Sequence, residues 1–536
     1  MTTQAINFPA SRRTAYQFPI YRWMGWLAVG GFAIGLTAMF FISGMFGIPA
    51  PIGWAALVIL LSAGALLLDR PRLLLNTMLF YFLLVPNNRL FGLLWLPIPG
   101  SVNKLFFIPF IAVIVMNWIQ RRQLKEATLF PLVFIILTGL SWYVNGRPSI
   151  FNTIQLTLVM MRTYILWYFC RLTCTFENEH QLSRWVWGYI IYIAIQFFYN
   201  VLWQRAPWAR FHPDHSGGVF GPEGAGAAHM VGYMSVFGLL LIAGWWVSAG
   251  HHARPRKRFL AALTALVIAY NLIFMTDTKH ILVLFPLIAF PFFIHPSVSF
   301  RLKMSLLAAG SIFLIGVAVY FSTAVNMSRV LQYVDTIQTS PKGEMLYGVT
   351  VDLPYLARYP WLGTGPGTFC SPQAVEARTR LARQYIIPYR DEERRRTLFG
   401  VRGTTLTSSV IGGTQTDFFI LMGEYGWLAT AAYLGFWIWL IVRLLQKSKR
   451  LPSHRLLSGV YIALACCLLA QLFILGLVGM LLVPPLTYPI WILVGRAWDM
   501  RMEEDKTVAP EEPNTVRPQR KFLGHTDAPA PQMLRA

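Results

Sequence analysis

The chain has 536 residues, of which 55% are hydrophobic and only 13% are charged, and its mean hydropathy is +0.50. A soluble protein of this size would carry about a quarter charged residues, so the composition excludes an ordinary soluble protein. The formal net charge of +23 would indicate a nucleic-acid partner in a soluble protein, but here much of it lies between apolar runs and predicts membrane orientation, with no nucleic acid expected.

Apolar runs long enough to cross a bilayer recur from Trp23 to Val494. Backbone groups in lipid must satisfy one another, so these runs are expected to be helices. The first run is full length and many others follow it, which favours a span over a signal peptide. The sequence therefore predicts an all-α polytopic membrane protein of about 14 transmembrane helices (roughly 12–14) with one large extracytoplasmic loop.

Five regions are predicted along the chain. Residues 1–24 form a basic cytoplasmic tail, residues 25–323 hold transmembrane helices 1–11, and residues 324–415 form the large extracytoplasmic loop. Residues 416–496 hold transmembrane helices 12–14. Residues 497–536 are rich in Pro and charged side chains, which indicates a disordered cytoplasmic tail.

Basic segments set the orientation, because cytoplasmic loops are enriched in Lys and Arg. The strongest such segment is residues 251–258, which read HHARPRKR. Every second loop is basic when the spans are counted in this way, which places both termini in the cytoplasm. The loop 324–415 is the exception, since it is outside by the count and yet rich in arginine. Long loops cross membranes largely regardless of charge, so the topology stands.

The charges of the large loop have two interpretations. A solvated helix of mixed charge fits residues 391–396, which read DEERRR. Alternatively, the arginines, together with Arg205, Arg210 and Lys279, form an anion site at the outer membrane face. Arginine suits that purpose because its guanidinium group binds phosphate through two parallel hydrogen bonds.

Four short segments occur in order within about residues 200–440. They are residues 218–226 (GVFGPEGAG), 276–279 (TDTK), 359–369 (YPWLGTGPGTF) and 417–429 (DFFILMGEYGWLA). In their order, topology and spacing around one long outer loop, they resemble the sequence elements of the O-antigen ligase and polysaccharide polymerase family.

That resemblance implies a membrane glycosyltransferase of the bacterial inner membrane. It would transfer or polymerise undecaprenyl-diphosphate-linked glycans at the outer face, onto a lipid or glycan acceptor, in contact with the lipid bilayer. It implies no metal and no cofactor, and a mechanism that uses arginines and a histidine in or around the large loop. Other polysaccharide assembly proteins are possible partners.

The chain departs from the family pattern in three places. Gln415 or Thr416 stands where the family has a histidine, and Lys279 replaces an arginine. His215, with Arg210 further back, stands where an arginine often occurs. These departures leave open a relative with altered or lost activity.

Transfer of a glycan requires a general base for the acceptor hydroxyl. The catalytic candidates on the outer side are Asp417, His280 and His215. Each has a simpler interpretation too: Asp417 could cap the helix that it opens, and His215 could be a solvated loop residue. We favour Asp417 slightly, with His280 as the rival.

Eight residues are candidates for substrate binding: Arg210, Lys279, Arg358, Arg402, Gly365, Gly367, Arg162 and Glu424. The glycines allow tight turns and close approach of the backbone to phosphate. Lys279 could instead snorkel at the interface. Arg162 and Glu424 lie within spans, where charges are expensive, so they are expected either to pair with each other or to hold the lipid diphosphate.

Two other functions stay open. A lipid-glycan transporter or flippase would be expected to have related halves, and no two-fold repeat is visible. A non-catalytic membrane component of a polysaccharide assembly complex fits the missing histidine. The sequence does not separate ligase from polymerase, and it identifies neither the sugar nor the acceptor.

Overall fold

The structure is a computed structural model that describes part of the chain. The described residues are 70–84, 107–121, 129–202, 217–218, 225–311, 357–383 and 416–500, apart from 277, 297, 302, 305–306, 309–310 and 478. Within these ranges the chain forms helices and turns and contains no strand. The all-α prediction is confirmed for this part of the chain.

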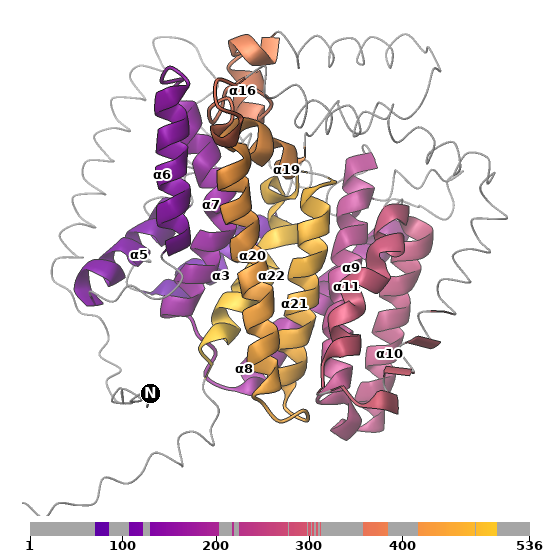
Figure 1. Ribbon diagram of the computed structural model, residues 1–536. Helices are drawn as coiled ribbons and strands as arrows, with labels where there is room; N and C mark the ends of the chain where they lie inside the picture. Colours follow the sequence, from indigo (N-terminus) through magenta and orange to yellow (C-terminus); the bar gives the residue numbers. More distant parts are fainter. Residues whose placement is uncertain are drawn as a thin grey trace, which may run out of the picture.

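The helices form one bundle, and most of them run along a common direction (Figure 1). In chain order they are α3 (Pro71–Leu84), α5 (Phe107–Arg121), α6 (Leu129–Val144), α7 (Ile150–Thr173), α8 (Glu179–Leu202), α9 (Ala225–Val247), α10 (Pro255–Tyr270), α11 (Lys279–Ile294), α16 (Pro372–Glu376), α19 (Asp417–Ile420), α20 (Gly426–Lys449), α21 (Leu456–Leu475) and α22 (Pro484–Trp498). The π-helical turn η5 (Asn271–Met275) extends α10, and a second one, η9 (Leu421–Tyr425), joins α19 to α20. Short 3-10 turns are η4 (Gly250–His252), η7 (Pro360–Leu362) and η10 (Met480–Leu482).

Within the described ranges, five helical stretches are long and apolar enough to cross a membrane. They are Glu179–Leu202, His229–Val247, Pro255–Met275, Asp417–Lys449 and Leu456–Leu475. The outer faces of the bundle expose large apolar side chains, among them Ile136 on α6, Ile191 on α8 and Leu266 on α10. Such surfaces are stable against lipid and not against water. The protein is therefore a multi-pass membrane protein.

The described helices lie where the third to tenth and twelfth to fourteenth spans are expected. The first, second and eleventh predicted spans lie outside the described residues, as do residues 1–24 and most of the loop 324–415. The count of about fourteen spans thus stays a prediction. The pair Pro484–Pro485 opens α22, where a first helical turn tolerates proline because its N–H groups have no partner in the helix.

The core of the bundle is α21, which packs between α9 and α20, while α22 packs against α7. Almost every residue of α21 is buried. Its closest contact is with α9, where a Cβ atom on Gly459 would lie 2.0 Å from the carbonyl oxygen of Gly244. Small residues at such a crossing let two membrane helices approach at their backbones.

The two ends of the bundle differ in charge. The sequence is basic where α9 meets α10 and where α20 meets α21, and both junctions lie at the bottom of Figure 1. Residues 359–371, α16 and α19 lie at the opposite end. By the positive-inside rule the basic end is predicted to face the cytoplasm.

Cysteine labelling tests this orientation, because all five native cysteines are buried and should react slowly. Ser453 lies exposed at the basic end and Glu376 lies exposed on α16. We expect a membrane-impermeant maleimide to label Glu376→Cys in intact spheroplasts and Ser453→Cys only after the membrane is opened. Labelling of Ser453→Cys in intact spheroplasts would contradict the prediction that the basic end faces the cytoplasm.

Candidate functional site

The glycine loop, residues 359–371, lies on the junction between η9 and α20. Its backbone pairs with that junction, since the Thr364 N–H donates to Gly423 O at 2.9 Å and the Gly365 N–H donates to Glu424 O at 3.1 Å. The ends of α6 and α7 hold the loop from the other side. Their side chains that donate to loop carbonyls are Ser141 to Leu362 (2.6 Å), Asn145 to Gly363 (3.0 Å) and Thr153 to Pro366 (3.1 Å).

Two glycines allow this contact. Gly363 has φ +73° and Gly426 has φ +80°, a region that other residues rarely adopt. A Cβ atom on Gly426 would lie 2.4 Å from the backbone nitrogen of Gly363, and one on Gly363 would lie 2.6 Å from the backbone nitrogen of Gly426. The two backbones therefore touch at a place where no side chain fits.

Glu424 is fully buried beneath the glycine loop. Its carboxylate accepts four backbone N–H groups: from Gly367 at 2.5 Å, Phe369 at 3.1 Å, Cys370 at 2.6 Å and Ser371 at 2.6 Å. A buried carboxylate is tolerated only when hydrogen bonds replace the water that it has lost. Glu424 thus fixes the loop, and the loop in turn satisfies Glu424.

The ion pair considered for Arg162 and Glu424 is wrong. The carboxylate of Glu424 is occupied by the loop, and the two residues form no salt bridge. Arg162 is buried in α7 with its guanidinium group 5.3 Å from the ring centroid of Phe107. Its Nε has no hydrogen-bond partner among the described residues. The alternative, that Arg162 holds a lipid diphosphate, stays a prediction.

Asp417 is also fully buried, but its surroundings differ. The cap of α19 is Thr416, whose hydroxyl accepts the Phe419 N–H at 3.2 Å, so the capping interpretation of Asp417 is wrong. Instead, Oδ2 of Asp417 accepts the Leu481 N–H at 2.8 Å, across from η10. Oδ1 has no hydrogen-bond partner among the described residues. One oxygen of Asp417 is therefore buried without a hydrogen bond at the non-basic end of the bundle.

The remaining candidates are only partly described. Lys279 and His280 open α11, and the structure describes their backbone but not their side chains. Arg358 is exposed, with its guanidinium group 5.5 Å from the ring centroid of Tyr359. His215, Arg210 and Arg402 lie outside the described residues. Among the described residues, no cluster of three His, Cys, Asp or Glu side chains could hold a metal ion.

The backbone of the glycine loop is largely occupied. The N–H groups of residues 363–365, 367 and 369–371 all donate within the protein, and residue 366 is a proline. The sequence suggested that Gly365 and Gly367 offer amide groups to a phosphate. That is wrong for their N–H groups, because Glu424 takes both of them. What the loop offers to a ligand is therefore its surface and the side chain of the neighbouring Arg358.

A chain of buried polar groups starts at Gly218, the first residue of a segment singled out in the sequence. The Gly218 N–H donates to Asn200 Oδ1 at 2.7 Å, and Asn200 Nδ2 donates to Asn271 Oδ1 at 3.1 Å. Asn271 Nδ2 in turn donates to Ser235 Oγ at 3.4 Å. The chain ties α8, α9 and η5 together at the approach to residues 276–279. This polar chain was not predicted from the sequence, although an asparagine inside each of two apolar spans is a signal for one.

No protein-family model matches this sequence, and the curated proteins hold no significant match to it.

The four amide contacts predict a large effect for Glu424→Gln. The neutral amide keeps the shape but turns an NH2 group toward N–H donors, so we expect a loss of about 3 kcal/mol in unfolding free energy, the scale of charge-assisted hydrogen bonds. Denaturant titration of the purified protein in mixed detergent measures it. Glu376→Gln is the control, because Glu376 is exposed and should change stability by less than about 0.5 kcal/mol. Equal stability of the two variants would contradict the anchoring of the loop by Glu424.

Proposed function

We propose that this protein is a membrane glycosyltransferase of the O-antigen ligase or polymerase type. It would transfer or polymerise undecaprenyl-diphosphate-linked glycans at the outer face of the bacterial inner membrane, with both termini in the cytoplasm. The observation that carries the proposal is the docking of residues 359–369 on residues 417–429. These two segments resemble elements of that family, lie far apart in the chain, and join through Glu424 and the Gly363–Gly426 contact.

The position of Asp417 supports the assignment of a general base. Asp417 opens α19, which continues through η9 to Glu424, and its Oδ1 has no hydrogen bond among the described residues while Oδ2 accepts the Leu481 N–H. Ala357 packs against Phe419, two residues beyond Asp417, which brings the neighbouring Arg358 to the same end of the bundle. A carboxylate and a guanidinium group are thus present at the end that holds the glycine loop.

The chemistry assigns a separate task to each charge. Asp417 Oδ1 accepts the proton of the acceptor hydroxyl as its oxygen forms a bond to the anomeric carbon. The bond from that carbon to the phosphate oxygen breaks, and the lipid diphosphate leaves with both electrons. Arg358 and Lys279, with Arg210 and Arg402, neutralise the charge that develops on the leaving diphosphate. Because Asp417 is fully buried, η10 or a neighbouring segment must move to admit the acceptor.

Asp417→Asn tests the base. Asparagine keeps an oxygen for the Leu481 N–H, so the variant should fold, insert and melt as the unmodified protein does. Glycan transfer in proteoliposomes should fall by about 10²-fold or more, the usual contribution of a general base. His280→Ala is measured beside it. If Asp417→Asn transfers at the normal rate and His280→Ala does not, His280 is the base.

Lys279→Ala tests the anion site. We expect binding of undecaprenyl diphosphate to weaken by about 1.5–3 kcal/mol, the range for a hydrogen bond to a charged group. Lys449→Ala is the control, because Lys449 lies exposed at the basic end of the bundle. If both variants bind undecaprenyl diphosphate equally well, Lys279 is not part of the anion site. Movement of lipid-linked glycan across the vesicle membrane without transfer would favour a flippase.

A further inference from the structure

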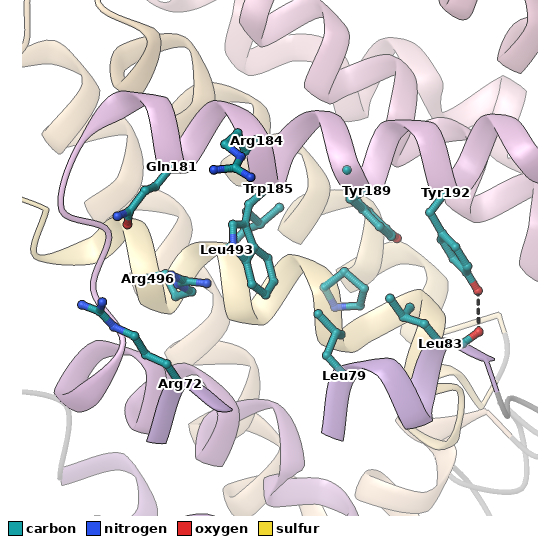
Figure 2. Close-up of a pocket in the computed structure, with 12 residues that line it drawn as sticks. Arg72, Leu79, Leu83, Gln181, Arg184, Trp185, Tyr189, Tyr192, Leu493 and Arg496 are labelled. Atoms are coloured by element: carbon teal, nitrogen blue, oxygen red, sulfur yellow. Dashed lines mark hydrogen bonds between the residues drawn. The ribbon is translucent and has the colours of Figure 1, made fainter. Parts of the chain in front are cut away.

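A slot of about 580 Å³ opens at the basic end of the bundle, between α3, α8 and α22 (Figure 2). Each helix contributes one stripe of side chains to it. The stripe on α8 repeats at helical spacing and consists of Gln181, Arg184, Trp185, Gly188, Tyr189 and Tyr192. The other two stripes are Arg72, Leu79 and Leu83 on α3, and Pro489, Leu493 and Arg496 on α22.

The slot is polar at one end and apolar along the rest of its length. All three stripes place their arginine at the same end, as Figure 2 shows for Arg72, Arg184 and Arg496. Leucine, proline and aromatic side chains line the remainder. The far end is closed by Tyr192, whose hydroxyl donates to Leu83 O at 3.0 Å. From Arg184 to Tyr192 the slot follows α8 for about 12 Å, at 1.5 Å per residue.

The three arginines are held to different degrees. Arg496 is buried, with its Nε donating to Cys174 O at 2.8 Å and its guanidinium group lying 4.2 Å from the ring centroid of Phe176. Arg72 pairs with Glu177 at 2.7 Å. Arg184 is exposed and has no hydrogen bond or ion pair among the described residues. The polar end thus carries more positive charge than the single carboxylate of Glu177 offsets.

Gly188 keeps the middle of the slot open. A Cβ atom at this position would have no other atom within 4 Å, although the residue lies in the middle of α8. Glycine in a helix interior costs roughly 1 kcal/mol relative to alanine, and no backbone contact here requires it. On the adjoining face of α8, Ile191 and Ile195 are exposed, so an apolar chain could enter from the side.

We propose that this slot binds one anionic phospholipid from the membrane leaflet at the basic end. Arg184 and Arg496 hold the phosphate of the headgroup, and an acyl chain lies along Leu79, Tyr189 and Leu493. A soluble phosphate would use the arginines but leave the apolar walls uncovered. A phospholipid contacts both, because its anionic headgroup adjoins its acyl chains as the arginines adjoin the apolar walls. The site is separate from the proposed glycan site at the other end of the bundle.

Titration of the purified, delipidated protein with dioleoyl phosphatidylglycerol, followed by native mass spectrometry, tests the site. The unmodified protein should bind one lipid tightly, and phosphatidylcholine should not compete. Arg184→Gln should weaken binding about fivefold, the effect of one basic residue on an anionic lipid. Gly188→Leu should abolish the tight binding, because the new side chain fills the slot.

Matched variants separate this slot from a general basic surface. Arg256→Gln removes an exposed arginine from the same end, and Gly139→Leu adds a side chain on α6 where a Cβ atom also meets nothing within 4 Å. Both should bind phosphatidylglycerol normally. Normal binding by Gly188→Leu, or equal weakening by Arg256→Gln and Arg184→Gln, would overturn the proposal. Displacement of the lipid by inorganic phosphate alone would show an ion site in its place.

Discussion

The end of the bundle that holds the glycine loop depends on one buried carboxylate. Glu424 has no exposed surface, and its stability there requires the four N–H groups that the glycine loop supplies. Those N–H groups converge only because the loop turns tightly through glycines with positive φ. The loop in turn reaches α6 and α7 through hydrogen bonds to its carbonyl groups. Removing the charge would therefore loosen the contact between three helices as well as the loop.

The same helix carries a second carboxylate with a different environment. Asp417 faces η10 with one oxygen held and one available, whereas every oxygen of Glu424 is occupied. Asp417 begins α19 and reaches η10, whereas Glu424 lies in the π-helical turn η9 and reaches the glycine loop. Glu424 therefore fixes the glycine loop, and Asp417 is the carboxylate that the proposed mechanism uses as its base.

The two ends of the bundle hold charged side chains in different ways. The end that holds the glycine loop buries the carboxylates of Asp417 and Glu424 and exposes Arg358 beside the loop. The basic end concentrates arginines over an apolar slot. Both arrangements let charged groups exist at the edge of a membrane, either by hydrogen bonding to the backbone or by facing anionic headgroups. The apolar core around α21 separates them.

The sequence by itself determined the helical membrane class, since apolar runs of that length have no other stable structure in lipid. It also singled out the glycine loop and the start of α19. Because Arg162 and Glu424 both lie within predicted spans, the sequence suggested an ion pair between them. Only the tertiary structure decided the partner of Glu424 and formed the slot beside Gly188, because a π turn changes the helical phase and stripes from three distant helices meet only after packing.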